Sequence, residues 1–354
     1  MNDDRLEIGV IGLGTHGLNR AQVLADFEHS VYGSDVNPDA RETFERWFSD
    51  SYFRTPSDLF DQEPDAVVIA TPNKYHEPVA VAAMERGIDV FIEKPLAHTL
   101  NSAERIAETA ANTGRICMVG FQSRFLNVCK ILKWYIDSGY FGDIEHVRSS
   151  YMRRRGVPGR GSWYTSRELA GGGALLDIGV HVIDLLFYFL DEPVVSDIAS
   201  AVRRDFGDRE SYSYLDMWGE DDDAEMFDVE DSVSGFLQFE SGTTATIEVA
   251  WAVNNKSTHT HHIHGTKAGA SLDITDILTN QAEVVQNLEF YTARSGGADH
   301  YLDTSVTANW NDPYREQMNV FTDVVTRDGT PPMNTIEEGL AVQRLVDRIY
   351  TENE

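Results

Sequence analysis

A glycine-rich hexapeptide near the start of the chain does most to limit the possible folds. Gly12-Leu13-Gly14-Thr15-His16-Gly17 follows an apolar run and precedes a helical segment. In this context Gly12 permits a tight turn, Gly14 lets the backbone approach a pyrophosphate, and Gly17 lets the helix pack closely on the strand. The pattern favours a dinucleotide-binding unit over a glycine-rich turn that binds nothing.

Short apolar runs and helical stretches alternate from residue 6 to about 122. The expected strands are Leu6 to Ile11, Ser30 to Gly33, Ala66 to Ala70, Val90 to Ile92 and Ile116 to Val119, with helices around 17–27, 38–48, 76–86 and 100–112. Such alternation is typical of a parallel sheet with crossover helices. We therefore expect a doubly wound α/β domain of the Rossmann type over residues 1–124.

A different pattern follows an expected helix near 125–138. Period-two strands dominate from 146 to about 293 and are interrupted by one very apolar helix at about 174–190. Hairpins are expected around Ser241-Gly242 and at Gly265 to Gly269. Two closing helices, at about 313–327 and 335–351, complete a second α/β domain over 125–354 and should pack back toward the first.

Acidic residues greatly outnumber basic ones in this chain. Its 354 residues include 58 Asp+Glu and 29 Lys+Arg, which gives a net charge of −29, and only 6 of the basic residues are lysine. This balance disfavours nucleic-acid binding, which needs clustered cations. Multimolar salt shortens the Debye length to about 3 Å and removes most of the self-repulsion. The composition favours a halophile's protein over a merely acidic mesophilic one.

The chain shows no signal for export or membrane insertion. Its first five residues are acidic overall, and nowhere do 18 uncharged apolar residues run together. The two cysteines, Cys117 and Cys129, flank an expected strand and helix and should be reduced thiols. A cytoplasmic location without membrane attachment is expected.

Asp35 bears on the choice of dinucleotide. It lies 18 residues beyond Gly17, just past the second expected strand. An acid there accepts hydrogen bonds from a ribose 2′-hydroxyl and repels a 2′-phosphate, which favours NAD over NADP. The alternative is that Asp35 only begins a turn with Asn37 and Pro38.

Polar residues also follow two later strands, in Thr71-Pro72-Asn73 and in Glu93-Lys94-Pro95. Ligands of open parallel sheets bind at the carboxyl ends of the strands. Pro95 holds Lys94 in an extended conformation and permits a cis bond. Lys94 could be a surface lysine paired with an acid, but in a chain with so few lysines a chemical role is favoured.

These motifs occur in the order and spacing of one family. The match also includes His76, Gly120 to Phe125, Gly142-Asp143-Ile144, Gly171 to His181 and Val229-Glu230-Asp231. The chain thus resembles the Gfo/Idh/MocA oxidoreductases, named for glucose–fructose oxidoreductase, inositol dehydrogenase and a rhizopine-catabolism protein. One departure is Gln122-Ser123 before Arg124, where members often carry another basic residue.

The resemblance implies a Rossmann domain, and a C-terminal α/β domain with a large, mostly antiparallel open sheet that often forms homodimers or homotetramers. It implies NAD(P)-dependent redox chemistry on a sugar, cyclitol or related polyol, with Lys94, Asp177 and His181 in catalytic positions. The residues expected at the cofactor are Gly12, Leu13, Gly14, Thr15, His16, Gly17, Asp35, Thr71, Pro72, Asn73, His76, Glu93 and Lys94.

The apolar helix carries three polar residues, Asp177, His181 and Asp184, whose i, i+4, i+7 spacing places them on one face. We expect His181 to remove a hydroxyl proton while hydride leaves for nicotinamide C4 and Lys94 stabilises the alkoxide. Asp177 would orient the imidazole or contact the sugar. Asp184 is expected to be structural.

Candidate substrate contacts are Arg124, the loop residues Arg154, Arg155, Trp163 and Tyr164, and, more weakly, Asn254. For the loop residues among them, ordinary loop anchoring is equally compatible with the pattern. The histidines at 259, 261, 262 and 264 alternate between strand faces, so at most two could converge and no metal site is expected.

Two other functions fit the same fold. One is a cofactor-sensing regulator without catalysis, which has no need for Lys94, Asp177 and His181 together. The other is a lyase, hydrolase or epimerase that reduces and reoxidises NAD within one turnover.

Overall fold

The computed structural model describes residues 5–48, 51–207, 209, 227–275 and 287–353. It forms two compact units. The first contains the chain up to Gln122, Glu168–Gly171 and Asp312–Arg344, and the second contains Ser123–Arg167, Gly172–Asn311 and the chain from Leu345. The first break lies close to the boundary expected after 124. The segment 312–344, which the sequence reading placed in the second domain, belongs to the first unit.

The first unit is built on a parallel sheet of six strands. In chain order these are β1 (Glu7–Ile11), β2 (Ser30–Ser34), β3 (Tyr52–Phe53), β4 (Ala66–Ile69), β5 (Asp89–Ile92) and β6 (Cys117–Val119). Their order across the sheet is β3-β2-β1-β4-β5-β6. The order reverses between β1 and β4, as in the doubly wound fold that the sequence predicts.

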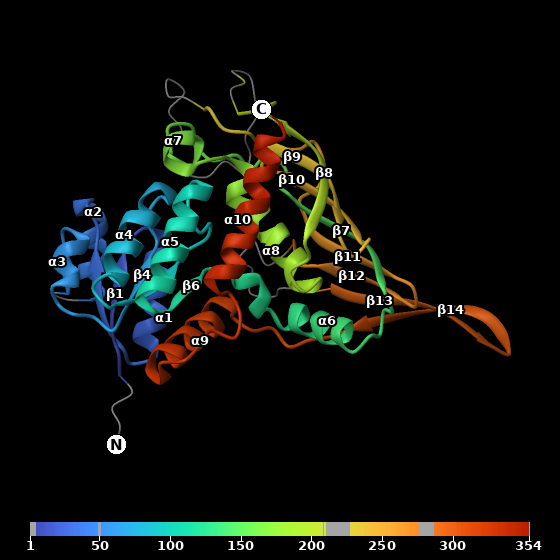
Figure 1. Cartoon of the computed structure of the whole chain (residues 1–354), viewed down its shortest axis with the longest axis horizontal. Coiled ribbons are helices and arrows are strands. Elements are labelled where there is room, and N and C mark those ends of the chain that lie inside the picture. Colours follow the sequence, from blue (N-terminus) through green and yellow to red (C-terminus); the bar gives the residue numbers. More distant parts are fainter. Residues whose placement is uncertain (1–4, 49–50, 208, 210–226, 276–286, 354) are drawn as a thin grey trace. The chain divides into compact units, whose positions relative to one another are not determined.

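Five helices connect these strands: α1 (Thr15–Asp26), α2 (Pro38–Glu45), α3 (Pro56–Phe60), α4 (His76–Met84) and α5 (Leu100–Thr113). Right-handed crossovers place α1 and α2 on one face of the sheet and the other three on the opposite face (Figure 1). The sequence reading missed β3 and α3, because segments this short show no periodicity.

A helix from the far end of the chain completes this unit. α9 (Pro313–Arg327) packs beside α1, and its Phe321 contacts Phe91 of β5 with ring centroids 5.5 Å apart. α10 (Ile336–Thr351) begins in the first unit and ends in the second. The aromatic contact gives the physical reason why 312–344 belongs with the Rossmann sheet.

The second unit contains an eight-stranded sheet with the order β14-β13-β12-β11-β7-β10-β9-β8. The strands are β7 (Ile144–Met152), β8 (Val195–Arg203), β9 (Ser232–Phe239), β10 (Thr244–Ala250), β11 (Thr258–Gly265), β12 (Gly269–Asp273), β13 (Asn287–Gly296) and β14 (Ala298–Val306). Every pairing is antiparallel except β7 with β10.

The expected hairpins β9–β10 and β11–β12 are confirmed. A third hairpin, β13–β14, extends past the expected end of the strand region near 293. Almost every residue of β14 is exposed. A strand without a buried face has no need for hydrophobic alternation, so no periodic pattern predicted β14.

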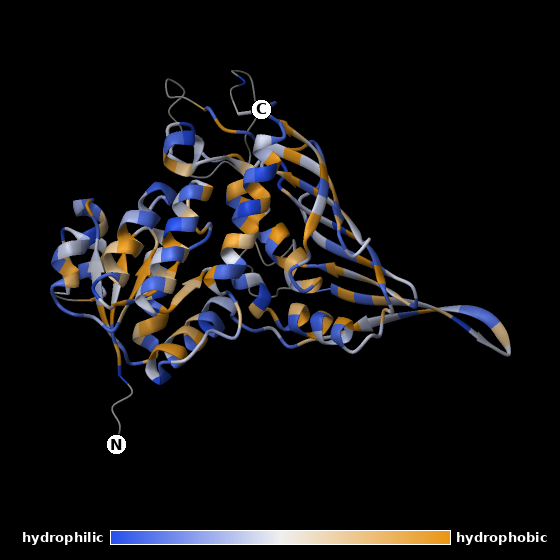
Figure 2. Cartoon of the chain, viewed as in Figure 1, coloured by the Kyte–Doolittle hydropathy of each residue, from blue (hydrophilic) through white to orange (hydrophobic). Residues whose placement is uncertain are grey.

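Helices cover one face of this sheet. α6 (Asn127–Asp137) lies against α8 (Val180–Phe189), and α8 packs on β7. The expected helix over 174–190 begins instead with a π-helical turn, Leu175–Gly179, which packs on β10. Figure 2 shows apolar residues concentrated along α8.

Among the described residues one helical run, Arg167–Phe189, is apolar and long enough to cross a membrane by composition. Within it, 83% of the most apolar window is buried inside the protein. Burial in the core therefore accounts for its composition.

Candidate active site

The glycine turn lies at the carboxyl end of β1 and has little space for side chains. Gly12 has a φ of 92°, and a Cβ atom there would stand 2.5 Å from the carbonyl oxygen of Ala70. A Cβ on Gly17 would stand 1.9 Å from the carbonyl oxygen of Gly12. Gly14 has no other atom near its Cβ position. Two glycines thus serve packing, and the third leaves the backbone open to a ligand.

Gly14 is also the N-cap of α1, and no side chain caps the backbone there. The first N–H groups of a helix need acceptors, and the helix dipole favours an anion at that end. Thr15 and His16 in this first turn are exposed. The turn therefore suits the pyrophosphate of a dinucleotide.

Asp35 follows β2 and lies beside the glycine turn. One of its carboxylate oxygens accepts from the backbone N–H of Leu13 at 2.7 Å, and the other accepts from Asn37 N–H at 2.8 Å. Arg41 donates to the Asp35 carbonyl oxygen at 2.6 Å. Asp35 therefore does begin the turn at Asn37, and it also fixes its carboxylate next to the glycine turn.

The residues after β4 are mostly committed to internal contacts. Asn73 is buried and donates to the carbonyl oxygen of Ala170 at 2.8 Å. The two ring nitrogens of buried His76 lie 2.9 Å from Thr71 O and 3.0 Å from Pro95 O. Burial lowers the pKa of His76, despite these carbonyl partners. His76 therefore ties the β4 turn to the β5 turn, which favours a positioning role over direct contact with a ligand.

The residues after β5 combine a buried ion pair with the predicted catalytic lysine. Glu93 accepts from Nε of Arg20 at 2.7 Å, and a terminal nitrogen of Arg20 donates to Gln317 of α9 at 2.7 Å. Burial alone would raise the pKa of Glu93, but Arg20, His16 and Lys94 hold it below its ordinary value. The Lys94–Pro95 bond is cis. Lys94 therefore directly follows Glu93, whose carboxylate is held in place by Arg20.

These residues share one edge of the sheet. Asp35, Gly12, Thr71 and Lys94 follow β2, β1, β4 and β5, four neighbouring strands. At the same edge the hydroxyl oxygens of Ser34 and Thr71 are buried, with no hydrogen-bond partner among the described residues. Three features of this edge fit a bound dinucleotide: the glycines without room for side chains, the uncapped end of α1 and the hydroxyl groups without a partner among the described residues.

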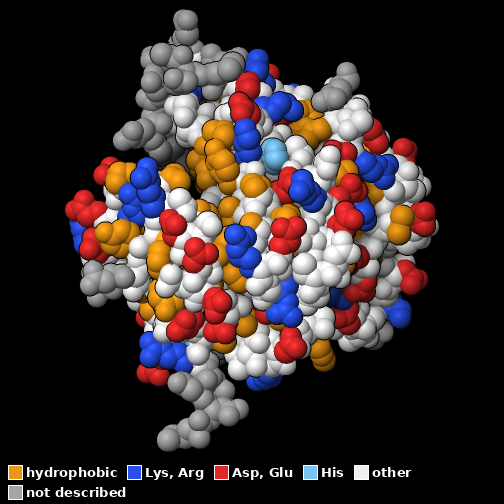
Figure 3. Space-filling view, turned by 60° about the vertical axis from the view of Figure 1, so that its left-hand side comes forward, with side chains coloured by type: hydrophobic (Ala, Val, Ile, Leu, Met, Phe, Trp, Pro, Cys, Tyr) orange, Lys and Arg blue, Asp and Glu red, His pale blue; other side chains and the backbone are white. Residues whose placement is uncertain are grey.

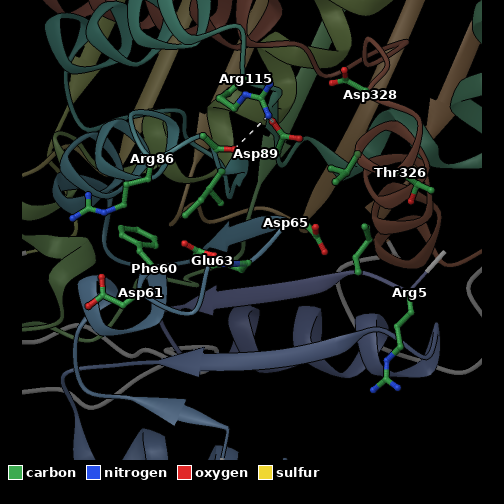
Figure 4. Close-up of a pocket in the computed structure, with 15 residues that line it drawn as sticks. Arg5, Phe60, Asp61, Glu63, Asp65, Arg86, Asp89, Arg115, Thr326 and Asp328 are labelled. Carbon is green, nitrogen blue, oxygen red and sulfur yellow. Dashed lines mark hydrogen bonds and ion pairs between the residues drawn. The ribbon is translucent and has the colours of Figure 1, made fainter. Parts of the chain in front are cut away.

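A hollow of about 1200 Å³ lies at the opposite edge, where the strands begin (Figure 4). Asp65, just before β4, and Asp89, the first residue of β5, contribute to its lining. Arg115 reaches toward Asp89 at 3.6 Å. The glycine turn and Lys94 do not line it, so this hollow is separate from the predicted cofactor edge.

In the second unit, Asp177 lies in the π-helical turn and is held by two groups. Nε1 of Trp251, just after β10, donates to one carboxylate oxygen of Asp177 at 2.9 Å. The guanidinium of Arg153, just after β7, lies 3.8 Å from the same oxygen. The same guanidinium donates to the hydroxyl of Tyr151 at 3.0 Å. Burial alone would lower the pKa of Arg153, but Tyr151 and Asp177 hold it above its ordinary value.

His181 lies near an aromatic stack. Its ring centroid is 6.5 Å from that of Tyr151, which stacks on His259 at 4.3 Å. Burial, and next the neighbouring His261 and His181, lower the pKa of His259 well below its ordinary value. A neutral His259 therefore supports the Tyr151 ring beside His181.

The third polar residue of the helix, Asp184, pairs with Arg124. Asp184 accepts a hydrogen bond from Nε of Arg124 at 2.9 Å, a terminal nitrogen of the same guanidinium lies 2.8 Å away as an ion pair, and both side chains are almost fully buried. The structural role expected for Asp184 agrees with this pair. Arg124 was expected to contact substrate, but in the structure its guanidinium pairs with Asp184 in the interior of the second unit.

Glu230 anchors the start of the apolar helical run. Its carboxylate accepts from the backbone N–H groups of Gly173 and Leu175, both at 2.9 Å. The hydroxyl of Tyr350 in α10 donates to it at 2.8 Å. This cap fixes where the π-helical turn, and hence Asp177, begins.

The loop after β7 carries the remaining candidates. Arg154 is exposed, and Arg155 donates to Asn254 at 2.7 and 3.1 Å. The rings of Trp163 and Tyr164 stack on each other with centroids 3.7 Å apart. One face of each ring is therefore occupied by its neighbour.

The histidines of β11 alternate as expected. His259 and His261 are buried, whereas His262 and His264 face the other side of the sheet. No group of three or more His, Cys, Asp or Glu within the described ranges is placed to hold a metal ion. Cys117 and Cys129 are buried thiols without a disulfide.

Sequence reasoning missed four residues of the second unit that surround Asp177 and His181: Tyr151, Arg153, Trp251 and His259. Each lies at the end of a strand or on a neighbouring strand, where position along the sequence does not reveal the contact. The one available signal was that all four lie within the region of period-two strands expected from 146 to about 293.

Comparison with known proteins identifies related sequences. Residues 6–121 match the oxidoreductase family with an NAD-binding Rossmann fold, and residues 130–271 match the GFO/IDH/MocA C-terminal domain. An oxidoreductase subunit of Amycolatopsis mediterranei assigned to UDP-kanosamine synthase is 33% identical over 273 residues, which cover 75% of this chain and 74% of the relative.

The D-glucoside 3-dehydrogenase of Escherichia coli is 32% identical over 224 residues, which cover 63% of this chain and 62% of that enzyme. Among solved structures, levoglucosan dehydrogenase in complex with NADH and levoglucosan superposes with a TM-score of 0.80 at 21% identity. That match covers 98% of this chain and 96% of the other. It supports the two-unit fold along the whole chain.

Proposed function

Because this chain belongs to the GFO/IDH/MocA family of oxidoreductases, we propose that it transfers a hydride between NAD and a hydroxyl-bearing carbon of a sugar, cyclitol or related polyol. The observation that carries this proposal is the edge of the parallel sheet where Asp35 and Lys94 flank an open glycine turn. The sugar and inositol dehydrogenases among its relatives support the substrate class.

Bound NAD supplies the hydride acceptor at nicotinamide C4. His181 takes the proton of the substrate hydroxyl while the carbon–hydrogen electron pair leaves as hydride, and a carbonyl forms. The ammonium of Lys94 stabilises the oxygen as negative charge develops on it. Asp177, held by Trp251 and Arg153, orients the imidazole or a neighbouring hydroxyl of the sugar.

NAD is the proposed cofactor in preference to NADP. The carboxylate of Asp35 is fixed beside the glycine turn by the N–H of Leu13. A fixed negative charge there favours a ribose hydroxyl and repels a phosphate.

The test is nicotinamide absorbance in multimolar KCl with a panel of aldoses, cyclitols and 3-keto sugars. Lys94→Ala should lower kcat/KM by at least about 100-fold, because electrostatic stabilisation of the oxyanion is lost. NAD affinity, measured by fluorescence, should change little. Lys267→Ala, at an exposed lysine of the β11–β12 turn, is the matched control and should keep full activity.

Turnover by Lys94→Ala within about tenfold of the unmutated protein would overturn the role of the lysine. Cofactor binding without net turnover of any substrate would instead point to a regulator, or to an enzyme that recycles NAD within one turnover.

We also propose a cytoplasmic homo-oligomer of a salt-adapted cell, free of membranes and nucleic acid. The wide second sheet supports self-association, and the net charge of −29 supports salt adaptation. Light scattering in multimolar KCl should give a mass of two or four chains, and a monomer would contradict the proposal.

A further inference from the structure

Two loops of the second unit leave the sheet at the same edge. β7 and β10 are its parallel pair, with Met152 opposite Ala250, so the loops that follow them, residues 153–162 and 251–257, start side by side. Backbone bonds join them, from Arg153 N–H to Ala250 O at 2.9 Å and from Gly156 N–H to Trp251 O at 2.7 Å. We call these two segments the paired loops.

The charge of the paired loops is opposite to that of the whole chain. Their 17 residues include Arg153, Arg154, Arg155, Arg160 and Lys256 and no acid, although 58 of the 354 residues of the chain are Asp or Glu. Random placement would give about three acids in a stretch of this length. A basic segment in so acidic a chain is suited to an anion, because its cations attract negative charge locally.

Two of the arginines are held in place. Arg155 has a φ of 58°, which is uncommon for a residue with a side chain, and its guanidinium is fixed by Asn254 at 2.7 Å. Arg153 is fixed by Tyr151 and lies 3.8 Å from Asp177. The basic loops thus adjoin a predicted catalytic residue within the same unit.

We propose that the paired loops bind a phosphoryl group carried by the sugar substrate, as a phosphate ester or a nucleoside diphosphate. This inference rests on the proposed function. A guanidinium group can donate two parallel hydrogen bonds to two oxygens of a phosphoryl group. Several cations also suit the double negative charge of a phosphoryl group better than the single charge of a carboxylate. The pyrophosphate of the dinucleotide has its own site at the start of α1, in the other unit.

The test compares matched sugars: glucose with glucose 6-phosphate, N-acetylglucosamine with its UDP derivative, and glucose with glucuronate. We expect kcat/KM for a phosphorylated sugar to exceed that for its neutral counterpart by about tenfold or more. Arg154→Gln and Lys256→Gln should each lower this ratio several-fold. Arg46→Gln, which alters an exposed pair with Glu42 in α2, should leave it unchanged.

Binding of inorganic pyrophosphate, measured by calorimetry with NAD present, provides a readout that does not need turnover. Saturable binding that weakens in Arg154→Gln and not in Arg46→Gln supports the inference even if no sugar is oxidised, in which case only the proposed function fails. Any of three results would overturn the inference. These are equal kcat/KM for neutral and phosphorylated sugars, an equal gain in kcat/KM with glucuronate, or pyrophosphate binding that Arg154→Gln does not weaken.

Discussion

At the scale of single residues, the carboxylate of Asp35 begins a turn and also lies beside the glycine turn. Its carboxylate accepts from Leu13 and Asn37, which fits both a turn and a ribose contact. Asp35→Asn keeps an oxygen acceptor and removes the charge. Since Arg41 already lies beside this position, the ratio of kcat/KM for NADP to that for NAD should rise about tenfold or more.

Steady-state kinetics with both cofactors measure this ratio. Asp39→Asn, at an exposed acid of the first turn of α2, is the control and should leave it unchanged. An unchanged ratio in Asp35→Asn would assign Asp35 to the turn alone.

The buried pair of Arg20 and Glu93 predicts a large stability effect. Removing one partner of a buried pair leaves an uncompensated charge, which costs about 3–5 kcal/mol. Arg20→Ala should therefore lower the free energy of unfolding by about this amount in denaturant titrations at fixed KCl. Arg46→Ala, which breaks the exposed pair with Glu42, should cost less than about 1 kcal/mol.

The same pair predicts a pH dependence. The pKa of Glu93 lies below its ordinary value of 4.5 in the folded protein, because Arg20, His16 and Lys94 outweigh the effect of burial. A depressed carboxyl pKa contributes stability above the unfolded pKa, and this contribution is lost as pH falls through the folded value. The stability difference between the unmutated protein and Glu93→Gln should be full near neutral pH and shrink below about pH 4.5. A difference that stays constant to lower pH would contradict this assignment.

At the scale of elements, the turn that carries Asp177 depends on a close backbone approach. A Cβ atom on Gly173 would stand 1.9 Å from the carbonyl oxygen of Glu230, and Glu230 caps the turn through Gly173 and Leu175. Gly173→Ala should cost at least about 2 kcal/mol, because backbone must move.

Gly296→Ala is the matched control, since its Cβ would meet no atom within 4 Å. It should change the free energy of unfolding by no more than about 0.5 kcal/mol. Equal stability of the two variants would show that the cap tolerates a shift of the helix start.

At the scale of the whole molecule, charge should govern stability. Acidic side chains are scattered over the face shown in Figure 3, between basic and uncharged ones. Because salt screens repulsion among them, the melting temperature should rise by about 10 °C or more between dilute and multimolar KCl. Replacing three exposed acids, Glu108, Asp197 and Glu240, with their amides should reduce this rise. A melting temperature independent of KCl would argue against salt adaptation.

The sequence by itself determined five of the six strands of the first sheet, the glycine turn, the hairpins β9–β10 and β11–β12, and the helical run that carries Asp177 and His181. Each of these features depends on residues that are close together along the chain, because hydrophobic periodicity and turn residues determine the local backbone conformation. The short β3, the exposed β14 and the π-helical turn left no such signal.

Only the tertiary structure decided which distant residues meet. It paired Arg124 with Asp184, joined Arg20 of α1 to Glu93 and Gln317, and surrounded Asp177 with Trp251 and Arg153. It also placed 312–344 with the Rossmann sheet. These contacts depend on which elements become neighbours, and that choice is made by the packing of the whole core, in which sequence separation has no part.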